Sequence, residues 1–163
     1  MIRSLLSTVL FCLLLTACAQ DKKGEQVVTI KTSFGDMVAI LYNETPRHKE
    51  NMIKLINQKF YDSLLFHRVM SEFMIQGGDP DSKKAPAGQQ LGNGGPGYTV
   101  DAEFNPKLFH ERGALSAARV PDVANPTKAS SGSQFYIVTG KKYTLEELDQ
   151  DAENIRNAKK SQL

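Results

Sequence analysis

The sequence predicts a mainly β protein, built as an antiparallel barrel with flanking helices. Short β-prone segments recur along residues 27–140, and turns rich in glycine and proline separate them. A single amphipathic helix is expected near the start, without the regular alternation of strands and helices that a parallel sheet requires. With 163 residues the chain has room for one domain. We therefore expect one β-domain over residues 27–140.

The domain is predicted to open with a β-hairpin. Residues 27–32 alternate apolar and polar side chains, and residues 37–42 are apolar and β-prone. Between them, Ser33-Phe34-Gly35-Asp36 has the composition of a turn.

A helix is expected next, over Pro46–Gln58. Thr45 is a favoured N-cap residue type, and proline is favoured at the first helical position. Met52, Leu55 and Ile56 then fall on one helical face.

Short strands separated by turns should follow the helix. The β-prone segments are 64–70, 73–76, 98–100, 114–118 and 134–139. Thr144 and Glu147 have capping-box spacing, which predicts a final helix over residues 144–160. Its apolar side chains share one face, and we interpret residues 141–163 as a helical insertion or tail.

The N-terminus is typical of an exported lipoprotein. Arg3 precedes an apolar run over residues 5–15, a length that suits a signal peptide and is too short to span a bilayer. Leu15-Thr16-Ala17-Cys18 resembles a lipobox, so residues 1–17 are expected to be removed and Cys18 lipidated, with residues 18–26 as a tether. The alternative is an ordinary secretory peptide with a chance cysteine. We expect an anchor in the bacterial cell envelope, in the outer membrane facing the periplasm or the surface.

The composition argues against several kinds of partner and cofactor. Cys12 lies in the segment expected to be removed, so the mature chain would hold no thiol for a disulfide, a metal or nucleophilic catalysis. The formal net charge is only +2 and the basic residues are scattered, which argues against nucleic acid as a partner. We expect no metal, no cofactor and a monomer.

Two motifs of other enzyme classes are weak. Gly92-Asn-Gly94-Gly95-Pro-Gly97 matches G-x-G-x-x-G, but a β-prone segment follows it where a dinucleotide fold needs a helix. We interpret it as a turn. His67 near Ser63 or Ser71 could suggest a hydrolase, but the chain has no G-x-S-x-G nucleophile motif.

Phe66–Pro80, "FHRVMSEFMIQGGDP", carries a guanidinium and an amide in an apolar run. It resembles the signature of the cyclophilin family of peptidyl-prolyl isomerases. Other blocks similar to the family follow the family's order, over about residues 27–140. They are "TSFGDMVAILYNETPRHKENMIKLINQKFYDSLLFHRV", "LGNGGPGYTVDAEF", "GALSAARV" and "SGSQFYIV".

The resemblance implies a cyclophilin-like barrel that accelerates rotation about X–Pro bonds without covalent chemistry. Arg68 would then be the catalytic donor to the proline nitrogen. Phe73 and Met74 would form the wall of the proline pocket, and Gln76 would hydrogen-bond the substrate backbone. Proline-containing polypeptides would be the substrates.

The remaining implied contacts lie later in the chain. Gln134 matches a second polar contact, and Tyr136 stands where the family usually has phenylalanine, so its hydroxyl needs a partner or water. Ala118, Arg119 and Val120 fall on a segment whose backbone binds the substrate chain.

The chain departs from the family in two places. Residues 121–131 form a longer loop than the family's turn. After "FYIV" the family continues to a further pocket residue, a histidine and its last strands, and none of these is found before Leu163. We therefore expect a barrel lacking its last strands, and a chain that is a fragment of a longer protein. Two further functions stay open: a peptide-binding chaperone or interaction module of this fold with little turnover, and a structural lipoprotein.

Overall fold

The computed structural model describes residues 24–161. The predicted signal peptide, the predicted lipidation site Cys18 and most of the predicted tether lie outside the described residues. The elements are, in order, β1 (Gln26–Thr32), β2 (Gly35–Leu41), α1 (Pro46–Asn57), β3 (Arg68–Met70), β4 (Met74–Gly77), a short 3₁₀ helix (Pro80–Ser82), β5 (Thr99–Val100), β6 (Leu115–Ala117), β7 (Ser130–Ser131), β8 (Phe135–Val138) and α2 (Leu145–Lys160).

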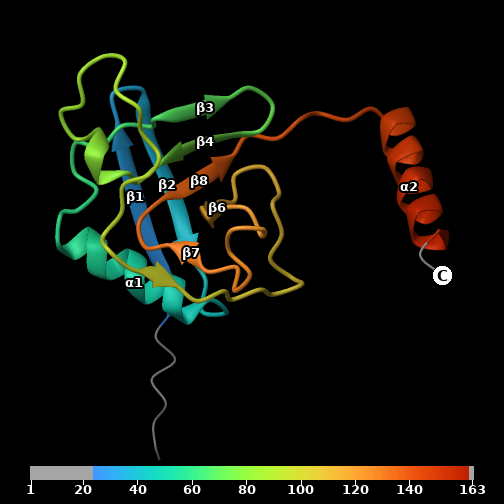
Figure 1. Cartoon of the computed structure of the whole chain (residues 1–163), viewed down its shortest axis with the longest axis horizontal. Coiled ribbons are helices and arrows are strands. Elements are labelled where there is room, and N and C mark those ends of the chain that lie inside the picture. Colours follow the sequence, from blue (N-terminus) through green and yellow to red (C-terminus); the bar gives the residue numbers. More distant parts are fainter. Residues whose placement is uncertain (1–23, 162–163) are drawn as a thin grey trace, which may run out of the picture.

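Within residues 24–161 the strands form three antiparallel sheets rather than one continuous closed ladder. β1 pairs with β2, β5 pairs with β7, and a four-stranded sheet has the order β3-β4-β8-β6. Figure 1 shows the hairpin β1–β2 crossing the face of this larger sheet. The mainly β character predicted from the turn-separated segments is therefore confirmed.

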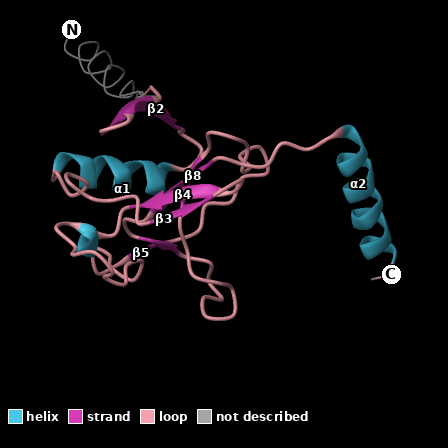
Figure 2. Cartoon of the chain, turned by 90° about the horizontal axis from the view of Figure 1, so that it is seen from above, coloured by secondary structure: helices cyan, strands magenta, loops and turns pink. Residues whose placement is uncertain are grey.

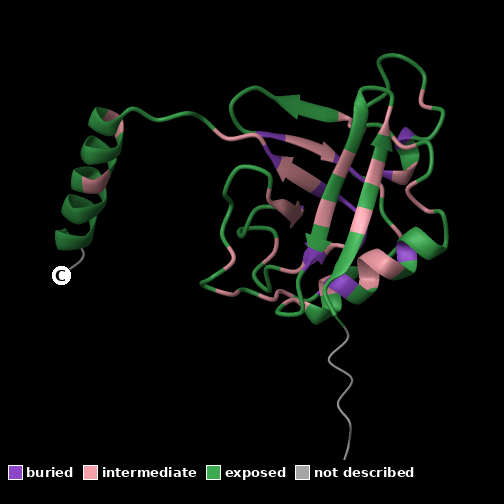
Figure 3. Ribbon diagram, turned by 180° about the vertical axis from the view of Figure 1, so that it is seen from behind, coloured by how far each residue is buried: buried purple, intermediate pink, exposed green. Residues whose placement is uncertain are grey.

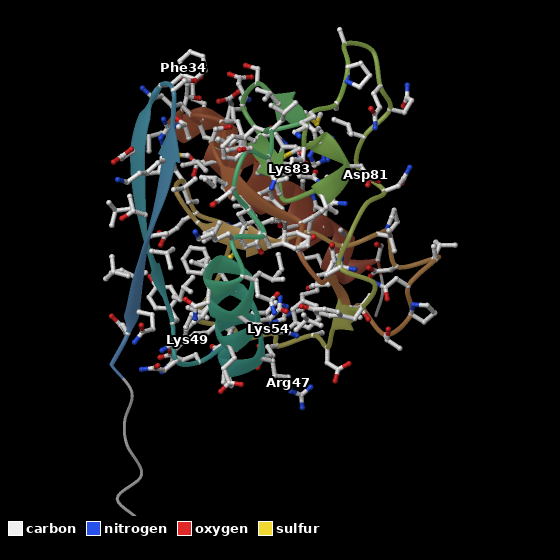
Figure 4. The ribbon with its side chains drawn as sticks, turned by 90° about the vertical axis from the view of Figure 1, so that its left-hand side faces the viewer. Phe34, Arg47, Lys49, Lys54, Asp81 and Lys83 are labelled. Carbon is white, nitrogen blue, oxygen red and sulfur yellow. The ribbon has the colours of Figure 1, made fainter. Side chains whose placement is uncertain are left out.

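The N-terminal hairpin forms where the alternating pattern predicts it. The strands pair from Gln26 opposite Leu41 to Thr32 opposite Gly35. Gly35 has φ +123°, a conformation that side chains with a Cβ rarely adopt. Exposure alternates along β2, as Figure 3 shows, and Phe34 projects from the hairpin tip in Figure 4.

The four-stranded sheet divides its side chains between two faces. Phe135 belongs to the face that carries Ile75 and Ile137, and it packs edge to face against Tyr61 and Phe66, with ring centroids 5.7 and 6.1 Å apart. Such aromatic pairs add stability beyond their buried area. This cluster ties the segment after α1 to the centre of the sheet.

α1 begins at Pro46, as predicted, but its N-terminus is capped from a distance. Thr45 occupies the N-cap position as predicted, but among the described contacts its side chain makes no capping hydrogen bond. The carboxylate of Glu103 instead accepts the backbone N–H groups of Arg47 (3.0 Å) and His48 (2.9 Å). His48 continues the link, because its ring bonds Glu103 at 2.6 Å and the Ser130 hydroxyl at 3.0 Å. Figure 2 shows α1 alongside the sheet, and Leu55 is buried on its inner face.

α2 is formed by local interactions. Thr144 and Glu147 make the predicted capping box. Acidic residues occupy its first turn and Lys159 and Lys160 its last, as the helix dipole favours. All of its residues are described, and none is buried; Leu145 and Ile155 are 80% and 69% exposed. The helix projects from the body in Figure 1.

Most strands between α1 and α2 are shorter than predicted, whereas β4 keeps its length and is shifted by one residue. Of residues 64–70 only Arg68–Met70 forms a strand, because the preceding residues leave the ladder and Leu65 N–H bonds the Ser82 hydroxyl at 3.1 Å. Phe73 lies just before β4. The strand β7 was not predicted, since its two serines have no apolar pattern. Among the described residues, neither helix is long and apolar enough to cross a membrane.

Replacing Glu103 by glutamine should destabilise the fold by about 1–2 kcal/mol at pH 7, because the charged cap of α1 is lost. Burial alone would raise the pKa of Glu103, but hydrogen bonds from Arg47 and His48 outweigh it and hold the pKa below the usual 4.5. A lowered pKa in the folded state gives stability that is present above the unfolded pKa. That stability is lost as the pH falls through the folded value.

Urea denaturation of the wild type and the Glu103→Gln variant should therefore show a stability gap that narrows as the pH falls below about 4.5. The matched control is Thr45→Ala, which should change stability by about 0.5 kcal/mol or less. A larger loss in the Thr45 variant than in the Glu103 variant would contradict the distant cap.

Candidate active site

One wide cavity brings the predicted site residues together. It has a volume of about 1230 Å³ and is lined by the hairpin, α1, residues 102–122 and both faces of the four-stranded sheet. Its lining contains all nine residues predicted to bind or turn over substrate: Arg68, Phe73, Met74, Gln76, Ala118, Arg119, Val120, Gln134 and Tyr136.

A polar row across the four-stranded sheet forms the centre of this site. Arg68 of β3 lies opposite Gln76 of β4, Gln76 lies opposite Tyr136 of β8, and Tyr136 lies opposite Ser116 of β6. Directly opposed residues in antiparallel strands share a face and are close neighbours. The polar row therefore faces away from the Phe135 cluster, and it shares its face with the buried Met74 and Val138.

Hydrogen bonds join the row to a glycine-rich loop. The Arg68 Nη1 donates to Gln76 Oε1 at 3.2 Å, and Gln76 Nε2 donates to Gln134 Oε1 at 2.9 Å. Gln134 Nε2 donates in turn to the carbonyls of Gly92 (2.9 Å) and Gly94 (2.7 Å). Gln134 is buried, whereas Arg68 is exposed. The guanidinium thus lies at the open end of a chain whose other end is held in the interior.

Apolar surface lies beside the guanidinium. Met74 is 1% exposed, and Phe73 is 50% exposed at the turn before β4. The carbonyl of Phe73 accepts the backbone N–H groups of Thr139 (3.0 Å) and Gly140 (3.1 Å), which fixes the backbone on which the ring stands. A half-exposed ring beside a buried thioether is suited to contact a small apolar ring such as that of proline.

The hydroxyl of Tyr136 has the hydrogen-bond partner that the sequence analysis required. Its hydroxyl lies 2.7 Å from Nε2 of His110, and the two rings stack with centroids 5.7 Å apart. Burial raises the pKa of Tyr136, although a hydrogen bond from Ser116 and the charge of Arg119 oppose the rise. The phenol therefore stays neutral at physiological pH and serves as a pocket wall with one polar edge.

The segment at Ala118 and Arg119 borders the cavity. The Ala118 N–H donates to the Gln134 carbonyl at 2.9 Å, and its own carbonyl accepts from Ser131 at 2.8 Å. The side chain of Arg119 turns to Asp122 in the long loop and forms an ion pair with it. These two residues, with Gln76 and Gln134, also line a second cavity of about 340 Å³.

Asp79 was not predicted as a site residue, yet it holds the loop on which Gln134 rests. The residue is fully buried, and its carboxylate accepts backbone N–H groups of Asp81 (2.8 Å), Gly92 (2.5 Å) and Gly94 (3.4 Å). Burial alone would raise the pKa of Asp79, but these backbone hydrogen bonds lower it overall. Its position before a proline signals only a local turn, and the partners lie 13 and 15 residues along the chain.

The histidines do not support the other enzyme classes. Both ring nitrogens of His67 are buried without a hydrogen-bond partner among the described residues, so neither Ser63 nor Ser71 forms a pair with it. Burial lowers the pKa of His67, which keeps its ring neutral. Within residues 24–161 no group of three or more His, Cys, Asp or Glu side chains could hold a metal ion. The Gly92–Gly97 segment is a loop followed by β5, not the start of a helix.

Comparison with known proteins agrees with this arrangement. A family model described as "Cyclophilin type peptidyl-prolyl cis-trans isomerase/CLD" matches residues 27–155. A peptidyl-prolyl cis-trans isomerase of Dictyostelium discoideum is 35% identical over 122 residues, which are 71% of this chain and 69% of that protein. Peptidyl-prolyl cis-trans isomerase A of Mycobacterium tuberculosis is 35% identical over 129 residues, covering 69% of this chain and 64% of that protein.

The match to a longer relative is partial. A protein of Streptococcus pyogenes serotype M6, whose name pairs a phosphatase with a peptidyl-prolyl cis-trans isomerase, is 39% identical over 125 residues. These residues make up 75% of this chain and only 24% of that protein. This chain therefore spans about a quarter of that relative and about two thirds of the two above.

Solved structures give the same family. A crystal structure of a cyclophilin type peptidyl-prolyl cis-trans isomerase from Cryptosporidium parvum has a TM-score of 0.61 and 31% identity, covering 73% of this chain and 70% of that one. A second structure of that protein, in the presence of the dipeptide Ala-Pro, has a TM-score of 0.59 and 27% identity over 77% of this chain and 84% of that one. With the family match over residues 27–155 and the site geometry above, this chain belongs to the cyclophilin family.

Proposed function

We propose that this chain is a peptidyl-prolyl cis–trans isomerase acting on proline-containing polypeptides. The observation that carries the proposal is the exposed guanidinium of Arg68, held by Gln76 beside the apolar pair Phe73 and Met74. The family membership and the Ala-Pro complex of a structural relative support it.

Isomerisation of an X–Pro bond requires no covalent step. Rotation about a peptide bond must cross about 18–20 kcal/mol, because amide resonance is lost at the twisted geometry. For X–Pro the two isomers differ by only about 0.5–1 kcal/mol, so what limits the process is the rate. A group that binds the twisted amide more tightly than either planar form is therefore sufficient for catalysis.

Arg68 supplies such a group. As resonance is lost, a lone pair localises on the proline nitrogen and becomes able to accept a hydrogen bond. A guanidinium carries five N–H donors and stays charged at any physiological pH, so donors remain after the bond to Gln76 is made. The donated bond is made in the twisted state and not in the planar one, which is the condition for rate enhancement.

The apolar and amide groups hold the substrate in place. The exposed Phe73 ring would contact the proline ring, and Gln76 would bond the flanking backbone, whereas the buried Met74 would support the pocket wall. Because Gln76 also accepts from Arg68, substrate and catalytic donor would share one anchor on β4.

Replacing Arg68 by alanine should lower kcat/KM on an Ala-Pro test peptide by about 100-fold, the loss typical of one transition-state donor. A protease-coupled isomerisation assay measures it. The matched control is Arg156→Ala, which removes the same charge from the projecting helix α2 and should leave the rate unchanged. Equal activity of the Arg68 variant and the wild type would remove Arg68 from the mechanism.

The alternative function is peptide binding with little turnover, for which the exposed Arg68 and Phe73 would also serve. NMR exchange spectroscopy on a proline peptide separates the functions: an isomerase broadens or exchanges the cis and trans signals, whereas a binder only shifts them. A purely structural lipoprotein would do neither.

The proposed cellular setting is the bacterial envelope. The lipobox-like Leu15-Thr16-Ala17-Cys18 supports lipidation of Cys18 and tethering of the domain to the membrane. Ala19 follows the lipidated residue in place of the aspartate linked with inner-membrane retention in enteric bacteria, which favours the outer membrane. The clients would then be exported proteins. Stable anchoring of a protein takes at least two hydrophobic signals, which the several acyl chains usual in lipoproteins provide.

Replacing Cys18 by serine should abolish incorporation of radiolabelled palmitate and release the protein from the membrane fraction. The wild type expressed alongside is the reference, and purified isomerase activity should be unchanged by the substitution because residue 18 precedes the domain. Unaltered palmitate incorporation in the variant would contradict lipidation at Cys18.

A further inference from the structure

We propose that Asp79 is a positioning residue of this site: it sets the orientation of the Arg68 guanidinium through the glycine loop and two glutamine amides. The inference rests on the proposed function, because it assigns a role in that same site. Asp79 is fully buried and does not line the cavity that holds the substrate-binding residues.

The first step is a carboxylate that can only accept. Asp79 is fully buried, and its two oxygens accept from three backbone N–H groups. Its lowered pKa keeps it ionised. An acceptor with no proton of its own leaves the N–H groups of Gly92 and Gly94 one orientation, pointing at Asp79.

The second step is the close fit of the loop around this carboxylate. A Cβ at Gly94 would lie 2.1 Å from Asp79 Oδ1 and 2.8 Å from Asp81 Oδ2. Gly92 has φ +109°, a conformation that favours glycine. The loop therefore approaches the carboxylate more closely than a chain with side chains could, and its position follows that of Asp79.

The third step fixes the direction of two amides. The carbonyls of Gly92 and Gly94 can only accept, so Gln134 must turn its Nε2 to them and its Oε1 to Gln76. Gln76 must then donate with Nε2, which leaves its Oε1 for the guanidinium of Arg68. If Gln134 rotated by half a turn, Gln76 would turn with it and present N–H donors to a cation. The acceptor that holds Arg68 would be lost.

The test is the Asp79→Asn variant of the full chain, assayed for kcat and KM on an Ala-Pro peptide. Asparagine has the same shape but only one acceptor oxygen, so its amide group faces a backbone N–H. We expect about a tenfold lower kcat with KM within about twofold, the size of one lost charged hydrogen bond. The matched control is Asp151→Asn, which makes the same change at an exposed position of the projecting helix α2. It should keep wild-type kcat.

A double-mutant cycle distinguishes positioning from a general structural effect. If Asp79 acts through Arg68, Asp79→Asn should have no further effect on kcat in an Arg68→Ala background. An equal fold-loss in both backgrounds would overturn the inference. So would a wild-type kcat in the Asp79 variant.

The hydrogen-bond chain from Asp79 to Arg68 is called the relay below. Gln134→Glu interrupts this relay at a later step, and it is the test variant if the Asp79 variant does not fold. Its carboxylate cannot donate to the two glycine carbonyls, so kcat should fall by a similar factor. Unchanged kcat in the Gln134 variant would also overturn the inference.

Failure of the proposed function gives a different result. In that case the wild type itself lacks turnover, while the relay can still be read from the side-chain amide signals of Gln76 and Gln134 in ¹H–¹⁵N spectra. Asp79→Asn should shift both signals and raise their exchange with water, and Asp151→Asn should not. Unshifted amide signals would overturn the positioning role regardless of activity.

Discussion

The antiparallel register of β4 against β8 is the constraint on which the site and the core both depend. It sets Gln76 opposite Tyr136 on one face and Ile75 opposite Ile137 on the other. Side chains alternate with a period of two, so a slip by one residue would exchange the faces. Phe135 would then leave its aromatic partners, and the polar row would take the place of the Phe135 cluster. Stability of the core therefore enforces the geometry of the site.

Behind the site, polar groups are buried but paired. Gln134 and Asp79 lie out of solvent, and each is hydrogen-bonded to the loop at Gly92 and Gly94. In a medium of low polarity an unpaired amide or carboxylate would cost several kcal/mol, roughly 2–7 for a neutral group. A fully paired network is rigid for the same reason, since each alternative arrangement leaves a group unpaired. The exposed Arg68 is thus attached to the least adaptable part of the molecule.

Local patterns in the sequence predicted the elements whose determinants are local. The β1–β2 hairpin, the start of α1 at Pro46 and the capping box of α2 all follow from residues within a few positions of one another. The residue types of Arg68 and Gln76 within an apolar run were equally visible, and the structure brings them into one cavity. Hydrogen-bond partners that lie far apart in the sequence could not be predicted. Thr45 is a good cap by type, but Glu103 occupies the helix end from 56 residues away. Asp79 looks like a turn residue, and only folding brings Gly92 and Gly94 onto its carboxylate.

The proposed chemistry explains why the donor Arg68 is exposed while the residue that supports it, Gln134, is buried. A donor that stabilises a twisted amide must reach a substrate whose two planar forms differ in shape, so it has to stand at an open surface. It must also keep one orientation while the amide rotates, because a donor that follows the substrate would bind all forms equally and give no acceleration. Arg68 is held by Gln76, which the buried Gln134 holds in turn, and Met70 Sδ accepts a second guanidinium N–H at 3.0 Å. The exposure of Arg68 and the burial of Gln134 are therefore two requirements of the same reaction.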